Sequence, residues 1–188
     1  MKRNKLKKRG LKQFRSFVIK NFKESKEYIK EIKNFIWFSS ILFLIISLIG
    51  FFFPIFFEKE ILDLIKNILL ETEGMQGIEL IRFIMFNNIK SAFSGMIFGV
   101  LFGIVPLLIL IMNSYILGFV ASKTVASDGL LILWKLLPHG ILEIPAILIS
   151  ISLGLKLGMF IFSSRTTNKK IEFLNELINS VRVFIFNN

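Results

Sequence analysis

Long apolar runs dominate the middle of the chain and predict helices that cross a membrane. Residues 35–57 form a 23-residue stretch without a charged side chain. A bilayer core about 30 Å thick needs about 20 helical residues, so this run is long enough to span. We expect three further spans, over residues 89–111, 113–127 and 138–162. The predicted fold class is therefore all-α, a polytopic α-helical membrane protein with about four transmembrane helices.

One of these runs is short for a span. Residues 113–127 would form a helix only about 20 Å long. Asn113 and Ser114 favour turns and predict the boundary with the preceding run. We expect either that the short helix begins earlier, near Pro106, or that it lies in a thinned part of the bilayer.

Other segments repeat apolar positions at helical spacing and predict amphipathic helices at the membrane interface. Residues 59–70 do so within an acidic segment, 58–80, whose net charge is −4, and we assign this segment to the outer face. A cytoplasmic amphipathic C-terminal segment is expected over residues 163–188. Its apolar positions recur at intervals of three and four residues: Ile171, Leu174, Ile178, Val181 and Ile185.

Charge divides the chain into a basic tail and a nearly neutral body. Residues 1–34 hold 13 of the 24 Lys and Arg residues and three of the 13 Asp and Glu residues, a net charge of +10. Lys and Arg gather on the cytoplasmic side of membrane spans. We therefore expect a basic, amphipathic cytoplasmic segment over 1–34 and a transmembrane domain over 35–162. The protein would be a multi-pass protein of the cell membrane with a cytoplasmic N-terminus.

The same rule places the end of the last apolar run in the cytoplasm, because Arg165, Lys169 and Lys170 follow it. Four crossings that start in the cytoplasm also end there, so charge and parity agree. A basic tail can bind nucleic acid, but its position beside a span favours a topology signal. We expect it to contact the lipid bilayer through anionic lipids, and we expect no nucleic acid partner.

The composition excludes several kinds of protein and of site. With 54% apolar residues and 22 Phe, the chain has too few polar residues to cover a soluble domain of this size. The absence of cysteine excludes disulfides, Cys-ligated metals and thiol nucleophiles. A single histidine excludes a multi-His metal site within one chain. No nucleophile is paired with a base, so we expect no enzymatic activity and no cofactor.

Three ionisable residues at four-residue intervals interrupt the last apolar run: Lys135, His139 and Glu143. They share one helix face, and ionisable groups at membrane depth indicate a functional site. They could relay protons or bind a headgroup, or a neighbour could neutralise Glu143 and fix the helix in place. Pro138 and Pro145 flank the pair and predict irregular backbone there. Lys156 is expected to extend its amine to the cytoplasmic interface.

Small residues at intervals of four line one face of the second apolar run: Ser91, Gly95, Gly99 and Gly103. In lipid there is no hydrophobic drive between helices, and small residues allow close packing. We expect a helix-packing face here. The alternative is that the glycines only permit bends around Pro106.

Two stretches resemble the stage II sporulation protein M family. Residues 136–158, LLPHGILEIPAILISISLGLKLG, resemble its signature, and residues 86–118 carry its paired Asn, spaced glycines and a later Asn before a short helix. The family usually has Asn-Gly where this chain has Asn113-Ser114. The resemblance covers about residues 35–162. The matching positions are Asn87, Asn88, Asn113, Pro138, Gly140, Pro145, Gly154 and Gly158.

The resemblance implies a helical integral membrane protein and, in the sporulation branch, a scaffold that localises cell-wall hydrolases during engulfment. The family typically continues into a further C-terminal transmembrane helix, whereas an amphipathic segment occupies the end of this sequence. We expect a scaffold or assembly subunit of a membrane complex. Its partners would be further copies or other membrane proteins. The alternative is a transporter or lipid-handling subunit that uses His139 and Glu143.

Overall fold

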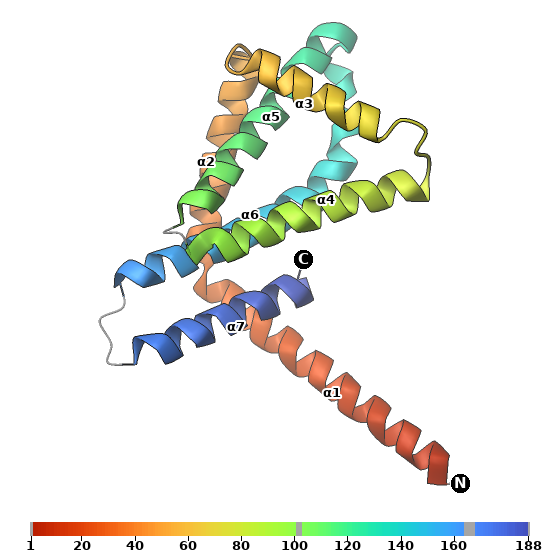
Figure 1. Cartoon of the computed structure of the whole chain (residues 1–188), viewed down its shortest axis with the longest axis vertical. Coiled ribbons are helices and arrows are strands. Elements are labelled where there is room, and N and C mark those ends of the chain that lie inside the picture. The colour runs from red at the N-terminus through yellow and green to blue at the C-terminus, as the bar shows by residue number, and fades with distance from the viewer. Residues whose placement is uncertain (1, 101–102, 164–167, 188) are drawn as a thin grey trace.

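The regular elements of the chain are helices joined by turns (Figure 1). The computed structural model describes the backbone of residues 2–100, 103–163 and 168–187, and side chains over 12–99, 103–131, 133–134, 143–160 and 168–186. The predicted all-α fold class is confirmed. The elements are α1 (Lys2–Glu31), α2 (Lys33–Phe52), α3 (Glu58–Glu71), α4 (Ile78–Ile97), η1 (Phe98–Val100), α5 (Ile104–Asp128), η2 (Leu130–Ile132), α6 (Leu133–Ser163) and α7 (Lys169–Asn187).

Three helices of the described chain are long and apolar enough to cross a membrane. They are α2, α5 and the part of α6 over 143–160. Two of them correspond to the runs predicted at 35–57 and 138–162. α5 begins at Ile104, which agrees with the first of the two alternatives for the short run, a helix that begins near Pro106. The predicted number of about four spans is not confirmed.

The run over 89–111 does not form one continuous helix, so that predicted span is wrong. It divides into the end of α4, the 3-10 turn η1 and the start of α5. Gly103 has φ +71°, a left-handed conformation that glycine adopts without steric cost. Pro106 lies in the first turn of α5, where its missing N–H leaves no carbonyl unpaired. Hydropathy did not reveal this reversal, because the turn itself is built from apolar and small residues.

The turn predicted at Asn113 and Ser114 is also wrong, because both lie inside α5. The Asn113 amide donates a hydrogen bond to the carbonyl of Ile109 (2.8 Å), and the Ser114 hydroxyl donates to that of Leu110 (2.6 Å). Each polar group is therefore satisfied one turn back on its own helix. A residue that bonds in this way need not end a helix.

α2 and α5 run parallel and touch through their backbones. A β-carbon added to Gly50 would overlap the carbonyl of Tyr115. A β-carbon added to Gly118 would overlap the carbonyl of Ser47 and lie 2.8 Å from the amide nitrogen of Phe51. Small residues are what permit such close approach between membrane helices. The sequence offered a weak signal for this contact, one glycine in each of two separate runs.

Polar contacts join the far ends of the same two helices. The Tyr115 hydroxyl donates to the carbonyl of Phe53 (2.9 Å) and accepts from the amide of Phe56 (3.0 Å). Lys123 forms an ion pair with Glu58 (2.5 Å). α2 ends at Phe52, five residues before the predicted end, because the residue before Pro54 is biased away from helical geometry.

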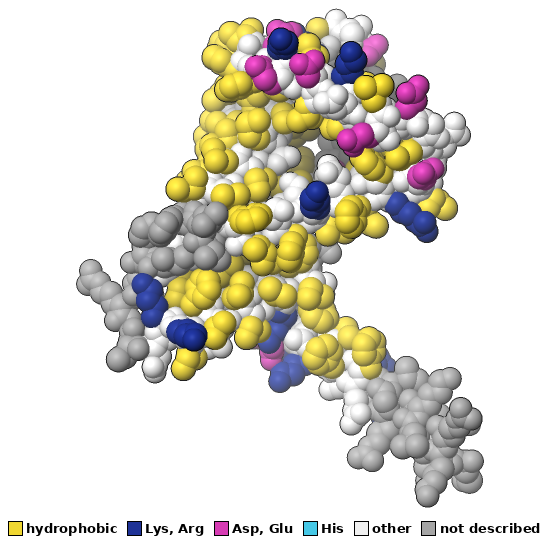
Figure 2. Space-filling model, viewed as in Figure 1, with side chains coloured by type: hydrophobic (Ala, Val, Ile, Leu, Met, Phe, Trp, Pro, Cys, Tyr) yellow, Lys and Arg dark blue, Asp and Glu magenta, His cyan; other side chains and the backbone are white. Residues whose placement is uncertain are grey.

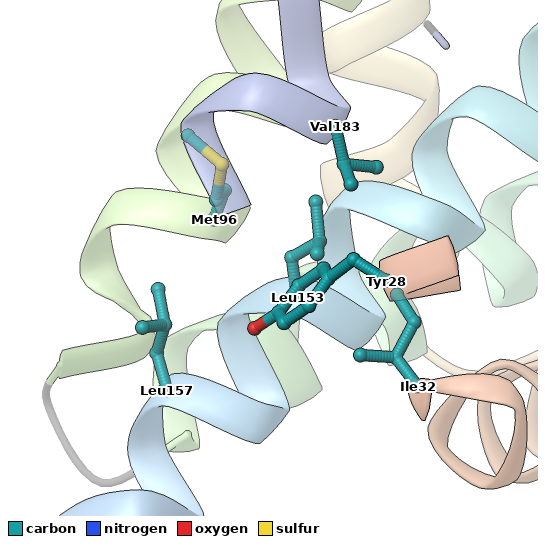
Figure 3. Packing of buried hydrophobic residues seen from close by; sticks show 6 residues of the cluster. All are labelled: Tyr28, Ile32, Met96, Leu153, Leu157 and Val183. Atoms are coloured by element: carbon teal, nitrogen blue, oxygen red, sulfur yellow. The ribbon is translucent and has the colours of Figure 1, made fainter. Parts of the chain in front are cut away.

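Because α2 and α5 are parallel, the chain between them must return to the end where α2 began. α3 lies at the far end, where Glu58 meets Lys123. α4 then leads back and ends near Met96, which belongs to the same hydrophobic cluster as Tyr28 and Ile32, beside the start of α2 (Figures 1 and 3). α3 confirms the amphipathic helix predicted over 59–70.

Two hydrophobic clusters hold these helices together. One joins α1, α4, α6 and α7 at the end of the spans where α2 begins (Figure 3). Its buried members are Tyr28, Ile32, Met96, Leu153, Leu157 and Val183. The other joins α5 and α6 and is covered by residues of α2, with Leu110, Leu148, Ile151 and Leu155 at its centre. α6 contributes to both clusters and is the helix that links the spans to α1 and α7.

We predict that Gly118→Leu destabilises the protein, because the new side chain has to push the α2 backbone away. Overpacking of this kind costs about 1–3 kcal/mol, measurable as a lower midpoint of thermal unfolding in detergent. Ala126→Leu is the matched control, since Ala126 is exposed on the same helix. Equal midpoints for the two variants would contradict a tight α2–α5 contact.

Candidate functional site

The ionisable residues predicted within the last run lie on α6, but the structure describes only one of their side chains. Those of Lys135 and His139 lie outside the described residues. Glu143 is partly buried and takes part in a polar interaction. A shared site of these residues stays a prediction.

The predicted irregular backbone near Pro138 and Pro145 is wrong, because α6 continues as one helix of 31 residues. A proline removes one backbone hydrogen bond, and a long helix packed against neighbours tolerates that loss. The expected transporter-like interruption rested on this broken backbone.

Among the positions that match the family pattern, the structure distinguishes tightly packed residues from exposed ones. Gly154 and Gly158 are buried where α6 crosses α4 and η1. Asn87 and Pro145 are exposed, and Asn88 is partly buried. Asn113 is bonded within α5. The side-chain surroundings of Pro138 and Gly140 lie outside the described residues.

The glycine face predicted on the second run lies against α6. A β-carbon added to Gly99 would overlap the backbone of Gly154. One added to Gly158 would come within 2.7 Å of the Cα of Gly103 and of the carbonyl oxygen of Gly99. Gly103 also has the left-handed conformation of the turn. Both alternatives predicted from the sequence, a helix-packing face and a bend near Pro106, therefore apply to this residue.

The earlier members of that face are less constrained. A β-carbon on Gly95 would lie 3.6 Å from the side chain of Ile151, an ordinary contact. The carbonyl oxygen of Gly95, however, lies so close to Gly154 that a β-carbon added to Gly154 would overlap it. Ser91 is partly buried one turn earlier. The tightest contact is therefore centred on Gly99 and Gly154.

A third small-residue contact, which the sequence pattern did not reveal, joins α2 and α6. The hydroxyls of Ser39 and Ser152 form a hydrogen bond of 3.2 Å, and both residues are fully buried. Ser152 also bonds to the carbonyl of Leu148 (2.6 Å). Interhelical bonds of this kind contribute about 0.6 kcal/mol on average in a membrane protein, so the contact orders the helices more than it stabilises them.

Lys156 on α6 is the centre of an ionic cluster that binds α1 and α7. Its Nζ lies 3.1 Å from Glu176 and 3.5 Å from Glu31, and 4.1 Å from the ring centroid of Tyr28. The side chain is only 18% exposed. The predicted extension of Lys156 to the cytoplasmic interface stays a prediction; in the structure its amine meets side chains of α1 and α7. Charge-assisted bonds and the face of an aromatic ring together hold the ammonium at this position.

Tyr28 completes this cluster from α1. Its hydroxyl donates a hydrogen bond to Glu176, and the residue is 4% exposed. Burial, and secondly the bond to Glu176, raise the pKa of Tyr28 above its ordinary value. The phenol consequently stays protonated and remains a donor at neutral pH.

Arg182 joins the same two helices further from the spans. It forms an ion pair with Glu24 (3.0 Å) and donates to the side-chain oxygens of Asn21 (3.0 Å) and Asn179 (2.9 Å). Glu176 faces Tyr28 while Arg182 faces Asn21, so α1 and α7 are antiparallel. The cluster of Lys156, Tyr28, Glu31, Glu176, Arg182 and Glu24 is called the clamp below.

An apolar groove of about 230 Å³ opens between the start of α2 and the end of α6. It is lined by Asn34, Phe35, Phe38, Leu155 and Met159. Its walls are hydrophobic apart from Asn34. Such a surface suits a hydrocarbon chain better than an ion or a polar solute.

A family model described as Stage II sporulation protein M matches residues 16–186. The match covers nearly the whole chain, including about half of α1 and almost all of α7, so the chain belongs to this family. It confirms the resemblance seen in the sequence and extends it beyond residues 35–162. No curated protein and no solved structure matches the chain.

We predict that Lys156→Met loosens α1 and α7 from α6, because it leaves two carboxylates without their cation. The loss should be about 1–3 kcal/mol, seen as faster proteolysis of the α1–α7 region and a lower unfolding midpoint. Lys123→Met is the control, since its ion pair with Glu58 is far more exposed and worth about 0–1 kcal/mol. If the two variants are cleaved at the same rate, the clamp does not hold the pair.

Proposed function

We propose that this member of the stage II sporulation protein M family is a non-enzymatic assembly subunit, or scaffold, of a membrane complex. The observation that carries the proposal is the clamp. It fixes two amphipathic helices, α1 and α7, as one platform at the end of the spans. The family match and the three apolar helices support the membrane location.

The polar groups support assembly over transport. In the described part of the chain, the charged clusters join helices to one another. The groove beside α2 is apolar. The continuous α6 removes the interrupted helix on which a substrate site at membrane depth would depend.

We place the platform in the cytoplasm, at the inner face of the cell membrane. α1 and α7 pack together, so the two ends of the described chain lie on one side of the spans. Basic residues concentrate in α1, whereas acidic side chains gather over α3 and the α3–α4 turn at the opposite end (Figure 2). The positive-inside rule then assigns the α1 end to the cytoplasm. α4 would supply the return pass that makes the number of crossings even.

The protruding part of α1 carries features of a lipid contact. Phe14, Phe17 and Phe22 are 67%, 60% and 41% exposed. Basic side chains alternate with them along the helix: Lys12, Arg15, Lys20, Lys23 and Lys26. Phenylalanine beside Lys and Arg favours the surface of an anionic bilayer. We propose anionic lipids and other membrane proteins as the partners.

The orientation predicts how single cysteines react in this cysteine-free chain. Lys12→Cys and Asn175→Cys should resist a membrane-impermeant maleimide applied to intact cells, whereas Glu73→Cys should react. All three positions are exposed in the structure, so a lack of labelling would come from the membrane barrier and not from burial within the fold. Labelling at Lys12→Cys or Asn175→Cys in sealed cells would overturn the orientation.

Affinity purification from native membranes in mild detergent tests the assembly role. The parent protein should retain a reproducible set of partners, and Lys156→Met should lose at least part of it because the platform is loosened. Lys123→Met should retain the full set. The proposal fails if the parent retains nothing beyond an unrelated tagged membrane protein, or if both variants retain the same set.

A further inference from the structure

α7 has two apolar faces, and the body of the protein uses one of them. Val183 and Ser180 are fully buried, and Phe173, Leu177 and Phe184 pack against the same core. The stripe predicted from the sequence is a different one. Its members Ile171, Leu174, Ile178 and Ile185 are 59%, 45%, 54% and 64% exposed. We call these four residues the outer stripe, together with Val181 at its edge, which is half-buried and also packs against the core.

The outer stripe has the spacing of a helix-packing seam. Its members follow one another at intervals of three, four, three and four residues, the pattern of the two core positions of a heptad. Isoleucine occupies one core position three times, and Leu174 and Val181 occupy the other. Knob-like side chains at this spacing fit the holes of another helix.

Charge favours a protein partner over lipid for this stripe. Interfacial helices that bind a membrane carry many basic residues beside their apolar face. α7 contains three basic and two acidic residues, and Arg182 is bound to Glu24. α1, by contrast, has a basic surface, so it suits contact with lipid better than α7 does.

We propose that the outer stripe is a dimer interface that binds the outer stripe of a second copy of this chain. The membrane holds all copies at one depth and in one orientation, so identical stripes meet at the same level. The proposal deepens the assembly role and rests on the proposed membrane orientation. The stripe spans about two heptads, too short to associate strongly alone. Confinement beside the membrane raises the effective concentration of the stripe and offsets its weak intrinsic association.

The fold also sets the direction of pairing. α7 runs across, rather than along, α2 and α5 (Figure 1). A two-fold axis parallel to the membrane normal makes two such helices antiparallel. The spacing suits this symmetry, because Ile171 and Ile185 each lie seven residues from Ile178. Ile178 then meets Ile178 of the second copy, and Ile171 meets Ile185 of the second copy.

Disulfide formation in native membranes tests this arrangement, because the parent chain has no cysteine. Ile178→Cys should form a cross-linked dimer under mild oxidation. Ile171→Cys and Ile185→Cys should cross-link when the two variants are co-expressed, and much less when each is expressed singly. Leu131→Cys, which is 82% exposed at the opposite end, measures random collision. Strong cross-linking of the single variants at 171 and 185 would show parallel pairing and overturn the arrangement.

Ile178→Glu tests whether the stripe drives association. Position 178 is exposed, so the variant should keep the parent's unfolding midpoint but lose the dimer in detergent, whereas Leu131→Glu should keep it. A carboxylate at the centre of an apolar seam should weaken association at least about 100-fold. An unchanged dimer in Ile178→Glu would overturn the proposal.

Spin labels distinguish a second copy of the chain from lipid and from water at the outer stripe. A nitroxide at 178 should be shielded from both oxygen and a nickel chelate in the dimer. Preferential access to oxygen would place the stripe in lipid, and preferential access to nickel would leave it open to water; either result overturns the proposal. Partner capture keeps the two proposals distinct, since a parent protein that is monomeric yet retains its partners would refute dimerisation alone, and a parent dimer that retains no partners would refute the assembly role alone.

Discussion

Direct contact between helix backbones is the constraint on which the arrangement of this protein depends. Lipid offers no hydrophobic reward for bringing two apolar helices together, so close approach has to come from small residues. Gly50 and Gly118 provide it between α2 and α5, and Gly99 and Gly154 between η1 and α6. At each of these positions a single β-carbon would collide with the backbone of the neighbouring helix. The paths of the membrane helices are therefore fixed at two points rather than along their whole length.

The direction of these contacts determines the topology. Parallel α2 and α5 need a connection that returns across the full thickness of the spans, and α3 and α4 supply it. α4 in turn runs parallel to α6, since Gly99 faces Gly154 while Gly103 faces Gly158. The chain consequently runs to the far end and back twice, first through α2 and α4 and then through α5 and α6. The start of the first pass and the end of the second bring α1 and α7 to one side, where the clamp can form.

The sequence predicted most elements but few of the contacts between them. Period and hydropathy located α2, α3, α6 and α7, because each has a clear apolar pattern of its own. The reversal at Gly103 was missed, since glycine and proline do not interrupt a hydropathy window. The role of Lys156 depends on Glu31, which is 125 positions distant in sequence, and no local pattern carries that information. The sequence pattern identified the outer stripe of α7 as apolar. Its exposure depends on which of the two apolar faces of α7 packs against the core.

The two kinds of contact in this structure differ in how much movement they allow. Backbone contacts at glycine cannot slide without collision, because packed interiors transmit strain rather than absorb it. Within the clamp, the pair of Lys156 and Glu31 can separate and form again at small cost, since Glu31 is 63% exposed and exposed pairs are weak. A partner that pulls on α1 would therefore loosen this exposed contact before it displaced the glycine contacts of the spans. This division suits an assembly subunit, in which the membrane part keeps a fixed shape while the platform adjusts to what it binds.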